Sequence, residues 1–226
     1  LFSEDRTGWL TTHTITLDES TTGETPADTQ PAVGPEVGPK EPSLGDRTLG
    51  FPDDPDFMQK LESRGVNGAM DTVETVYILT GTRGGVPTDL FRVDHPEYFS
   101  SADATSVTSF TGKIAQKIAA LYPDGETPGL VVRVHTHPNG TTTPSSEDRD
   151  GAASTRDPFE REFGTSDFRF FQAIHGLSEH NRNPPPAERQ QPKARSNTVS
   201  WDGERYHHDF AVFDKTFNPL RVEVLK

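Results

Sequence analysis

Hydrophobic residues occur in short runs along the chain, and the period of each run predicts a strand or a helix. Runs rich in β-branched and aromatic residues are typical of strands. They occupy residues 72–81, 89–95, 129–135, 167–177 and 220–226. Residues 199–214 hold two further runs on either side of Asp202 and Gly203, which predicts a hairpin.

Three segments predict helices. Residues 56–65 read as a short helix that ends at Gly65, and residues 145–163 read as a longer one that begins near Ser145. Between them, a third helix has apolar residues at helical spacing, namely Phe110, Ile114, Ile118 and Leu121. Strands interspersed with helices indicate a single α/β domain, a mixed sheet flanked by helices, over residues 57–226.

Two segments have no hydrophobic period. Residues 1–56 are rich in Pro, Thr, Gly and acidic residues, so we expect a mostly disordered acidic tail or linker. Within it, residues 9–20 show a short alternation that also fits an isolated strand or a docking peptide. Residues 178–198 are polar and rich in proline, which predicts a mobile insertion between two strands.

Composition narrows the classes of partner and site. The net charge of −13 argues against nucleic acid or an anionic membrane as the main partner, and twelve acidic against three basic side chains lie in residues 1–56. The chain has no cysteine, so a metal would be bound by His and carboxylates. Asp, Glu and Thr are abundant and lysines are few, a balance that is typical of proteins from halophiles. The acidic tail alone would account for part of it.

Targeting signals are not apparent in the sequence. The N-terminal residues lack a basic region followed by an apolar core, and no apolar run approaches the roughly 18 residues that span a bilayer. We therefore expect a soluble, cytoplasmic, non-secreted protein.

The stretch "VHTHPNGTTTPSSED" carries the candidate chemistry. Residues i and i+2 of a strand face the same side, so His135 and His137 can reach one point at the strand end. A catalytic zinc usually has three protein ligands and an open position, and Asp148 is the natural third ligand. Taken alone, Ser145 and Asp148 are typical of a helix capping box, and two histidines alone are a weak signal. Because the histidine pair and the Ser145–Asp148 pair lie close together in the sequence, each makes a metal site a better explanation of the other.

This stretch resembles the signature of the JAMM (MPN-plus) zinc metalloproteases, which reads His-x-His-Pro, six or seven residues, then Ser-x-x-Asp. The family also has an upstream Glu-x-x-Gly-x-Leu-x-Gly segment. Residues 74–81, "ETVYILTG", match it at Glu74, Leu79 and Gly81 and depart at Tyr77, where glycine is usual. The order of predicted elements agrees as well, over about residues 57–176.

The resemblance implies a cytidine-deaminase-like MPN fold and an archaeal-type desampylase or deubiquitinase activity. It implies one zinc per chain on His135, His137 and Asp148, with Glu74 as general base and Ser145 as a donor to the oxyanion. It further implies hydrolysis of isopeptide or peptide bonds at the C-terminus of ubiquitin-like modifiers, with the modifier and its conjugates as partners. A homodimer and a subunit of a larger complex are both left open.

Other interpretations remain at this stage. Gly140 and Pro144 give the motif a RadC-like local feature, which would mean the same chemistry on a different substrate. A third interpretation is that the protein is a non-catalytic MPN scaffold within a larger complex. His207 and His208 face opposite sides of a strand, so we do not expect them to chelate one metal. The remaining histidines are expected to serve packing or surface roles, namely His95, His175 and His180, with His13 in the tail.

Overall fold

The computed structural model describes residues 44–71, 73–93, 99–102, 107–109, 111–122, 125–152, 154–180 and 184–226. The acidic tail up to residue 43, with His13, lies outside the described residues, as do His95 and Phe110.

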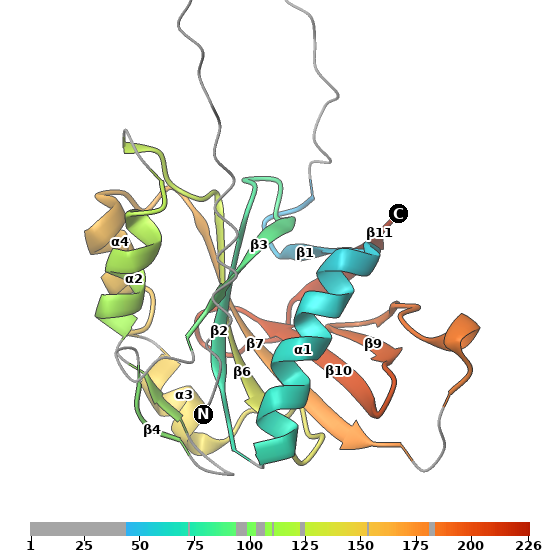
Figure 1. Cartoon of the computed structure of the whole chain (residues 1–226). Helices are drawn as coiled ribbons and strands as arrows, with labels where there is room; N and C mark the ends of the chain where they lie inside the picture. The colour runs from blue at the N-terminus through green and yellow to red at the C-terminus, as the bar shows by residue number, and fades with distance from the viewer. Residues whose placement is uncertain are drawn as a thin grey trace, which may run out of the picture. The chain divides into compact units, whose positions relative to one another are not determined.

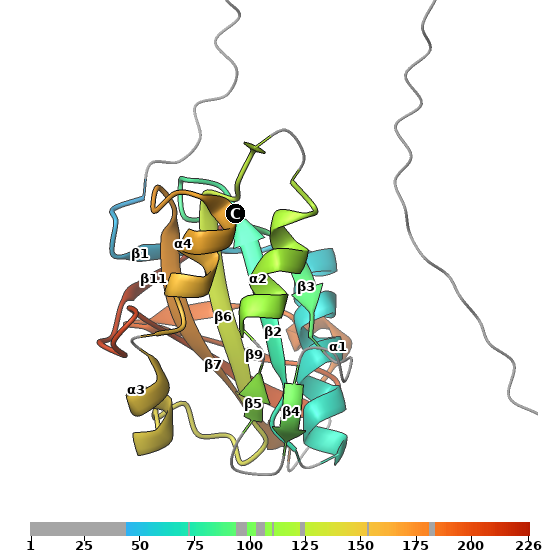
Figure 2. The same cartoon turned by 90° about the vertical axis from the view of Figure 1, so that its left-hand side faces the viewer.

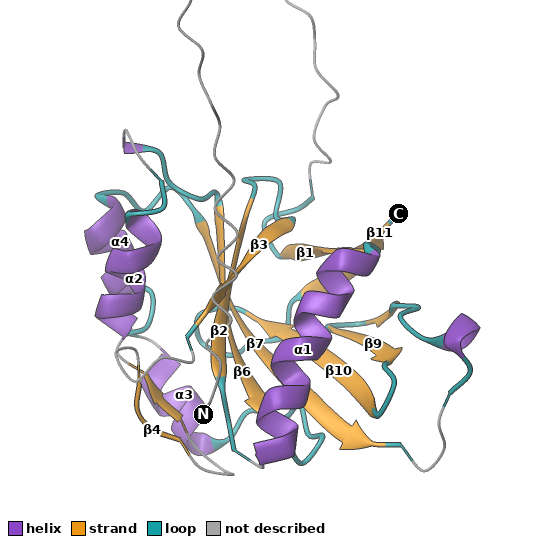
Figure 3. Ribbon diagram, in the orientation of Figure 1, coloured by secondary structure: helices purple, strands orange, loops and turns teal. Residues whose placement is uncertain are grey.

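Strands and helices are interspersed along the described chain (Figure 3). In order, they are β1 (Thr48–Pro52), α1 (Pro55–Asp71), β2 (Val76–Gly81), β3 (Pro87–Arg92), β4 (Phe99–Ala102), β5 (Val107–Ser109), α2 (Thr111–Ala119), β6 (Leu130–His137), α3 (Ser146–Ala152), α4 (Asp157–Phe163), β7 (Arg169–Glu179), a 3-10 helix η2 (Pro186–Glu188), β8 (Lys193–Arg195), β9 (Thr198–Asp202), β10 (Tyr206–Phe213) and β11 (Arg221–Leu225). None of the helices in these ranges has the length and apolar character that crossing a membrane requires.

The main sheet has seven strands in the order β3-β2-β6-β7-β10-β9-β8. The central pair, β6 and β7, is parallel, and every other neighbouring pair in this sheet is antiparallel. Helix α1 lies on one face, whereas α2 and α4 lie together on the other (Figures 1 and 2). The prediction of a mixed sheet flanked by helices is therefore confirmed.

Each face of the sheet has its own hydrophobic core, because the side chains of a strand alternate between faces. Under α1, Phe57, Met58 and Leu61 pack against residues that include Tyr77, Val132 and Val134. Under α2 and α4, the buried residues are Val76, Ile78, Val93, Ile114, Ala115, Ile118, Val131, Phe159, Phe168 and Phe170. The predicted packing of Ile114 and Ile118 is confirmed, whereas Leu121 lies beyond the end of α2 and is 58% exposed.

The folded domain begins before residue 57, which corrects the predicted domain boundary. Strand β1 lies within the segment expected to be disordered, and it pairs in parallel with β11 in a separate two-stranded sheet. Phe51 of β1 is fully buried and packs its ring against Trp201 and Phe210. This small sheet closes one side of the α1 core, so residues 48–52 are part of the domain.

Helix α1 is longer than predicted and runs through Gly65 to Asp71. Its start is well specified: Asp54 caps it by accepting a hydrogen bond from the Phe57 amide (2.7 Å), and Pro55 occupies its first position. Gly65 is buried where the helix meets the sheet, and a Cβ there would lie 2.7 Å from His175 Cε1. The glycine therefore permits close packing rather than ending the helix.

The structure corrects one further prediction and refines another. Residues 145–163 form two helices, α3 and α4, and α4 restarts with Pro158 in its first turn. Residues 178–198 contain, in their described part, the end of β7, η2 and β8, and β8 pairs with β9, so the predicted insertion between two strands has secondary structure of its own. Its mobility stays a prediction. The predicted hairpin over residues 199–214 is confirmed as β9 and β10.

Candidate metal centre

Strand β6 ends at His137 and presents both predicted histidine ligands on one face. His135 and His137 are buried, with ring centroids 4.9 Å apart. The face is the one that also carries Val131, which packs under α2 and α4. The i, i+2 spacing in the sequence therefore places the two imidazoles together as predicted.

A tight turn follows the second histidine and fixes its ring. The Gly140 amide donates to the His137 carbonyl (3.1 Å), and Gly140 has a φ of 79°, which favours glycine. The turn then passes over Gly176 of β7, where a Cβ would lie 2.6 Å from the Gly140 carbonyl oxygen. His137 Nδ1 is hydrogen-bonded to the Thr141 carbonyl (3.0 Å), which assigns the proton to Nδ1 and leaves Nε2 as the ligand atom.

Helix α3 brings the third predicted ligand to the strand end. Asp148 Oδ1 lies 3.0 Å from His135 Nε2, and Oδ2 lies 3.8 Å from His137 Nε2. One ligand atom from each of these three residues lies within 4.8 Å of the other two, and the described residues contain no second group of three that meets this criterion. The geometry thus brings together the set that the sequence predicted.

The donor atoms fit a zinc ion. Among the described residues, neither ring nitrogen of the buried His135 has a hydrogen-bond partner, although Nε2 is so close to Asp148. Both atoms belong to the group that could hold a metal, and a cation bound there would give the buried nitrogen a partner. Two imidazole nitrogens and one carboxylate oxygen match the ligands of catalytic zinc sites and leave a fourth position open.

Protonation states favour metal binding. Burial lowers the pKa of His135 and of His137, so both imidazoles are neutral near pH 7. Burial alone would raise the pKa of Asp148, but the adjacent His135 and the hydrogen bonds from Ser145 outweigh it and hold that pKa well below its usual range. Neutral imidazoles and an ionised carboxylate are the forms that bind a cation.

Glu74 lies two residues before the start of β2, beside the histidines. Its side chain is buried, and Oε1 is 3.5 Å from His137 Nε2. The last pair of the β2–β6 ladder joins Val76 to His135, so Glu74 stands two residues beyond that pair on the same face. The predicted catalytic glutamate therefore lies within reach of the open position of the site, some sixty residues upstream of its partners in sequence.

Ser145 forms a reciprocal cap with Asp148. Its hydroxyl donates to Asp148 Oδ2 (2.9 Å) and accepts from the Asp148 amide (3.1 Å), while its own amide donates to the same Oδ2 (2.8 Å). The capping box is thus present, and it also orients the carboxylate that serves as ligand. The role of Ser145 toward an oxyanion stays a prediction.

One charged neighbour of the site was missed by sequence reasoning. Arg133 lies two residues before His135 and therefore on the same face of β6. Burial lowers the pKa of Arg133, while the carboxylates of Asp148 and Glu74 raise it. The positive charge of Arg133 therefore offsets part of the charge of these two carboxylates. The same i, i+2 alternation that identified the histidines could have identified Arg133.

Another histidine group lies on the opposite face of the sheet. The Tyr77 hydroxyl is hydrogen-bonded to His175 Nδ1, and His175 Nε2 to His208 Nδ1, each at 3.0 Å. His208 stacks on Trp201 with the ring planes 3° apart. His175 thus packs in the core as predicted, and Tyr77, the departure from the family pattern, is its hydrogen-bond partner. His207 is turned away, toward Asp202 (2.6 Å).

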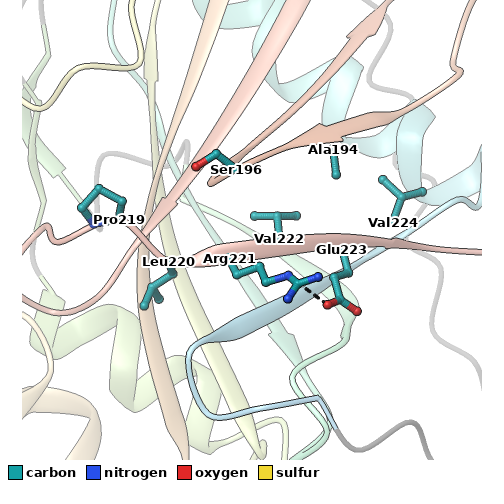
Figure 4. A pocket seen from close by; sticks show the side chains of 8 residues that line it. All are labelled: Ala194, Ser196, Pro219, Leu220, Arg221, Val222, Glu223 and Val224. Carbon is teal, nitrogen blue, oxygen red and sulfur yellow. Dashed lines mark ion pairs between the residues drawn. The ribbon is translucent and has the colours of Figure 1, made fainter.

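A surface groove of about 730 Å³ lies away from the metal centre, between β8 and β11 (Figure 4). It is lined by Ala194, Ser196 and residues 219–224, and Arg221 and Glu223 form an ion pair at its rim (3.1 Å). None of the predicted site residues lines it, so we do not assign the chemistry to this groove.

No protein-family model matches the sequence, and a search of curated proteins finds no match. Among solved structures, the chain is similar to a JAB1/MPN domain protein from Archaeoglobus fulgidus, at 11% identity and a TM-score of 0.35, over 79% of this chain and 97% of that one. A second similar structure is described as a metalloprotease-like zinc site, JAMM, in the proteasome and signalosome, at 12% identity and a TM-score of 0.34, over 79% of this chain and 99% of that one. At these values neither match assigns a family or an activity to the chain.

Proposed function

We propose that the protein is a zinc-dependent hydrolase of the JAMM type that cleaves isopeptide or peptide bonds at the C-terminus of ubiquitin-like modifiers. The observation that carries the proposal is the convergence of His135, His137 and Asp148 within 4.8 Å, with Glu74 buried 3.5 Å from His137. These residues would hold a metal and place a base beside it, and amide hydrolysis at a zinc site uses both.

The three residues that would hold the metal come from two elements of the fold. His135 and Asp148 come from different elements, β6 and α3, so the metal would tie the helix to the strand end. The Thr141 carbonyl and the Ser145 hydroxyl orient His137 and Asp148 respectively. When bound, zinc would polarise the scissile carbonyl and lower the pKa of a water molecule.

Glu74 would move the proton. Its carboxylate takes a proton from the attacking water as the water oxygen bonds to the carbonyl carbon, and it delivers that proton to the leaving amine nitrogen as the carbon–nitrogen bond breaks. No other group has to gain or lose a proton in this sequence. The buried position of Glu74 beside His137 keeps it from competing contacts with bulk solvent.

The substrate class rests on the motifs. "HTHPNGTTTPSSED" together with Glu74, Leu79 and Gly81 resembles the pattern of enzymes that remove ubiquitin-like modifiers. The leaving group would then be a lysine side chain or the amino terminus of a linear fusion. The partner would be the modifier. The acidic composition is typical of proteins from a high-salt cytoplasm, so the proposal places the enzyme there.

The test uses the full chain, loaded with zinc and assayed in high salt. The probes are a ubiquitin-fold protein ending in Gly-Gly, joined by an isopeptide bond to a lysine peptide or as a linear fusion, and unrelated peptides of similar length. We expect one zinc per chain, cleavage after Gly-Gly only, and loss of cleavage on chelation. Glu74→Gln should keep the zinc and lose hydrolysis by about 100-fold or more. The matched control is Glu147→Gln, an exposed glutamate on α3.

Two results would overturn the proposal. One is a Glu74→Gln protein with undiminished activity that a chelator still abolishes. The other is a zinc-loaded chain that cleaves the unrelated peptides and leaves both modifier probes intact, which would keep the metal chemistry and reject the substrate.

A further inference from the structure

A pair of threonines joins the segment that carries Glu74 to the segment that carries the histidine ligands. The Thr75 amide donates to Thr136 Oγ1 (2.8 Å), and the Thr136 amide donates to the Thr75 carbonyl (2.9 Å). The two hydroxyl oxygens are themselves 3.1 Å apart. Three contacts thus connect one residue of each segment.

The position of this pair is unusual because it lies at the end of the regular ladder. The last β2–β6 pair joins Val76 to His135, and the strands are antiparallel, so the next position outward pairs Thr75, one residue before Val76, with Thr136, one residue after His135. There the side-chain hydroxyl of Thr136 accepts the bond that a backbone carbonyl of an ordinary ladder would accept. The pairing is extended by one residue through a side chain.

The threonines and the site residues lie on opposite faces. Thr75 is flanked by Glu74 and Val76, and Thr136 by His135 and His137. Since successive side chains of a strand alternate, the two threonines meet behind the site while Glu74 and both histidines face it. Thr136 is fully buried, so water does not compete for its hydroxyl.

We infer that Thr136 is a positioning residue that holds Glu74 against the metal centre. The inference rests on the proposed function, because it assigns a role in setting the distance between the base and the ligands. The metal ligands are fixed by other contacts, from Thr141 to His137 and from Ser145 to Asp148. Loss of the Thr136 hydroxyl should therefore release the Glu74 segment and leave the ligand set intact.

The experiment compares Thr136→Val, which keeps the branched shape and removes the acceptor, with Thr136→Ser, which keeps the acceptor. In Thr136→Val we expect the zinc content of the wild type, a kcat about 10- to 100-fold lower with little change in KM, and amide exchange at Thr75 at least about 10-fold faster. Thr136→Ser should restore all three. If Thr136 served only the stability of the fold, Thr136→Val would not lower kcat while leaving KM unchanged. Thr136→Ser would then not restore kcat.

The outcomes separate the two proposals. A wild-type chain that hydrolyses neither modifier probe rejects the proposed function, while faster Thr75 exchange in Thr136→Val still supports the hold on the Glu74 segment. An active wild type with an unchanged kcat and unchanged Thr75 exchange in Thr136→Val rejects the inference alone. If Thr136→Val does not fold, Thr136→Ala against Thr136→Ser makes the same comparison without the branched methyl group, and equal kcat in that pair rejects the inference.

Discussion

His135 Nε2 lies 3.0 Å from Asp148 Oδ1 without the alignment of a hydrogen bond. The two atoms come from β6 and α3, elements that the chain separates by a turn and a proline-containing segment. A cation between them would satisfy both, whereas without it the imidazole nitrogen stays buried without a hydrogen bond.

Removing the charge of Asp148 should therefore weaken metal binding. We expect Asp148→Asn to bind zinc about 100-fold more weakly or worse, because a neutral amide oxygen is a poorer ligand for the cation than an ionised carboxylate. Isothermal titration with zinc measures the change. Asp150→Asn, an exposed carboxylate on the same helix, is the matched control and should bind as the wild type does. Equal affinities in the two variants would remove Asp148 from the ligand set.

Ser145 should affect both stability and metal affinity. Ser145→Ala removes the cap of α3 and the hydrogen bond to Asp148 Oδ2, so we expect a loss of about 1 kcal/mol in the free energy of unfolding. Zinc should bind about 10- to 100-fold more weakly, because the ligand carboxylate loses its orienting partner. Urea unfolding and zinc titration measure the two effects, with the exposed Ser146→Ala as control. Wild-type zinc affinity in Ser145→Ala would contradict the orienting role.

Gly65 should not tolerate a side chain, although it lies inside a helix. Alanine normally stabilises a helix interior relative to glycine by about 0.5–1 kcal/mol. At residue 65, however, a Cβ would stand 2.6 Å from Leu177 Cδ2 and 2.7 Å from His175 Cε1. We expect Gly65→Ala to lower the free energy of unfolding by about 1–2 kcal/mol. Gly151→Ala in α3, where a Cβ meets nothing within 4 Å, should be neutral or stabilising in the same urea titration.

Acid should weaken the fold through His175. Burial lowers the pKa of His175 to about 3, whereas an imidazole in the unfolded chain titrates near pH 6.5. Below about pH 6.5 the unfolded state binds a proton that the folded state refuses, so stability falls as the pH drops toward 3. For this residue alone we expect a loss of about 2 kcal/mol between pH 7 and 5.

His175 faces groups from several elements: Tyr77, His208, Trp201, and, on α1, Arg64 near Tyr77. The pKa of His208 is also lowered by burial, which adds to the same trend. Comparing the pH 7 and pH 5 unfolding free energies of the wild type and His175→Phe isolates the contribution of His175. An NMR titration that finds the His175 ring protonating near pH 6.5 in the folded protein would contradict the prediction.

The start of the folded domain gives a further prediction. A protein that begins at residue 44 should unfold at the same urea concentration as the full chain and bind zinc equally well. One that begins at residue 57 loses β1 and the buried ring of Phe51, and it should be destabilised by about 3–5 kcal/mol or more. Equal stability of the two truncated proteins would show that β1 contributes little.

The metal centre could be predicted from the sequence because its information is local. Two histidines at i and i+2, and a serine and an aspartate at i and i+3, report strand and helix geometry directly. The strand β6, the helix α2 and the hairpin of β9 and β10 follow from equally local patterns. Glu74 was identified by a motif and not by periodicity, because the residues next to it form an ordinary strand pattern that does not indicate chemistry.

Features that depend on distant contacts could not be predicted. Gly65 reads as a helix stop until His175 is known to lie beneath it. The Tyr77–His175–His208 group needs the strand order β2-β6-β7-β10, which no single segment specifies. Residues 48–52 lie among prolines and acids and form a strand only because β11 supplies a partner.

The pairing of β1 with β11 also bears on the order of folding. The first and last strands of the described chain pair with each other, so β1 gains its strand partner only when residues 221–225 are in place. Because this pairing joins segments at the two ends of the described domain, closing the loop between them costs much chain entropy, and we expect the pair to form after the central sheet. The final closure of the α1 core would then be the last step, and it would be the step most sensitive to changes in either of these two short strands.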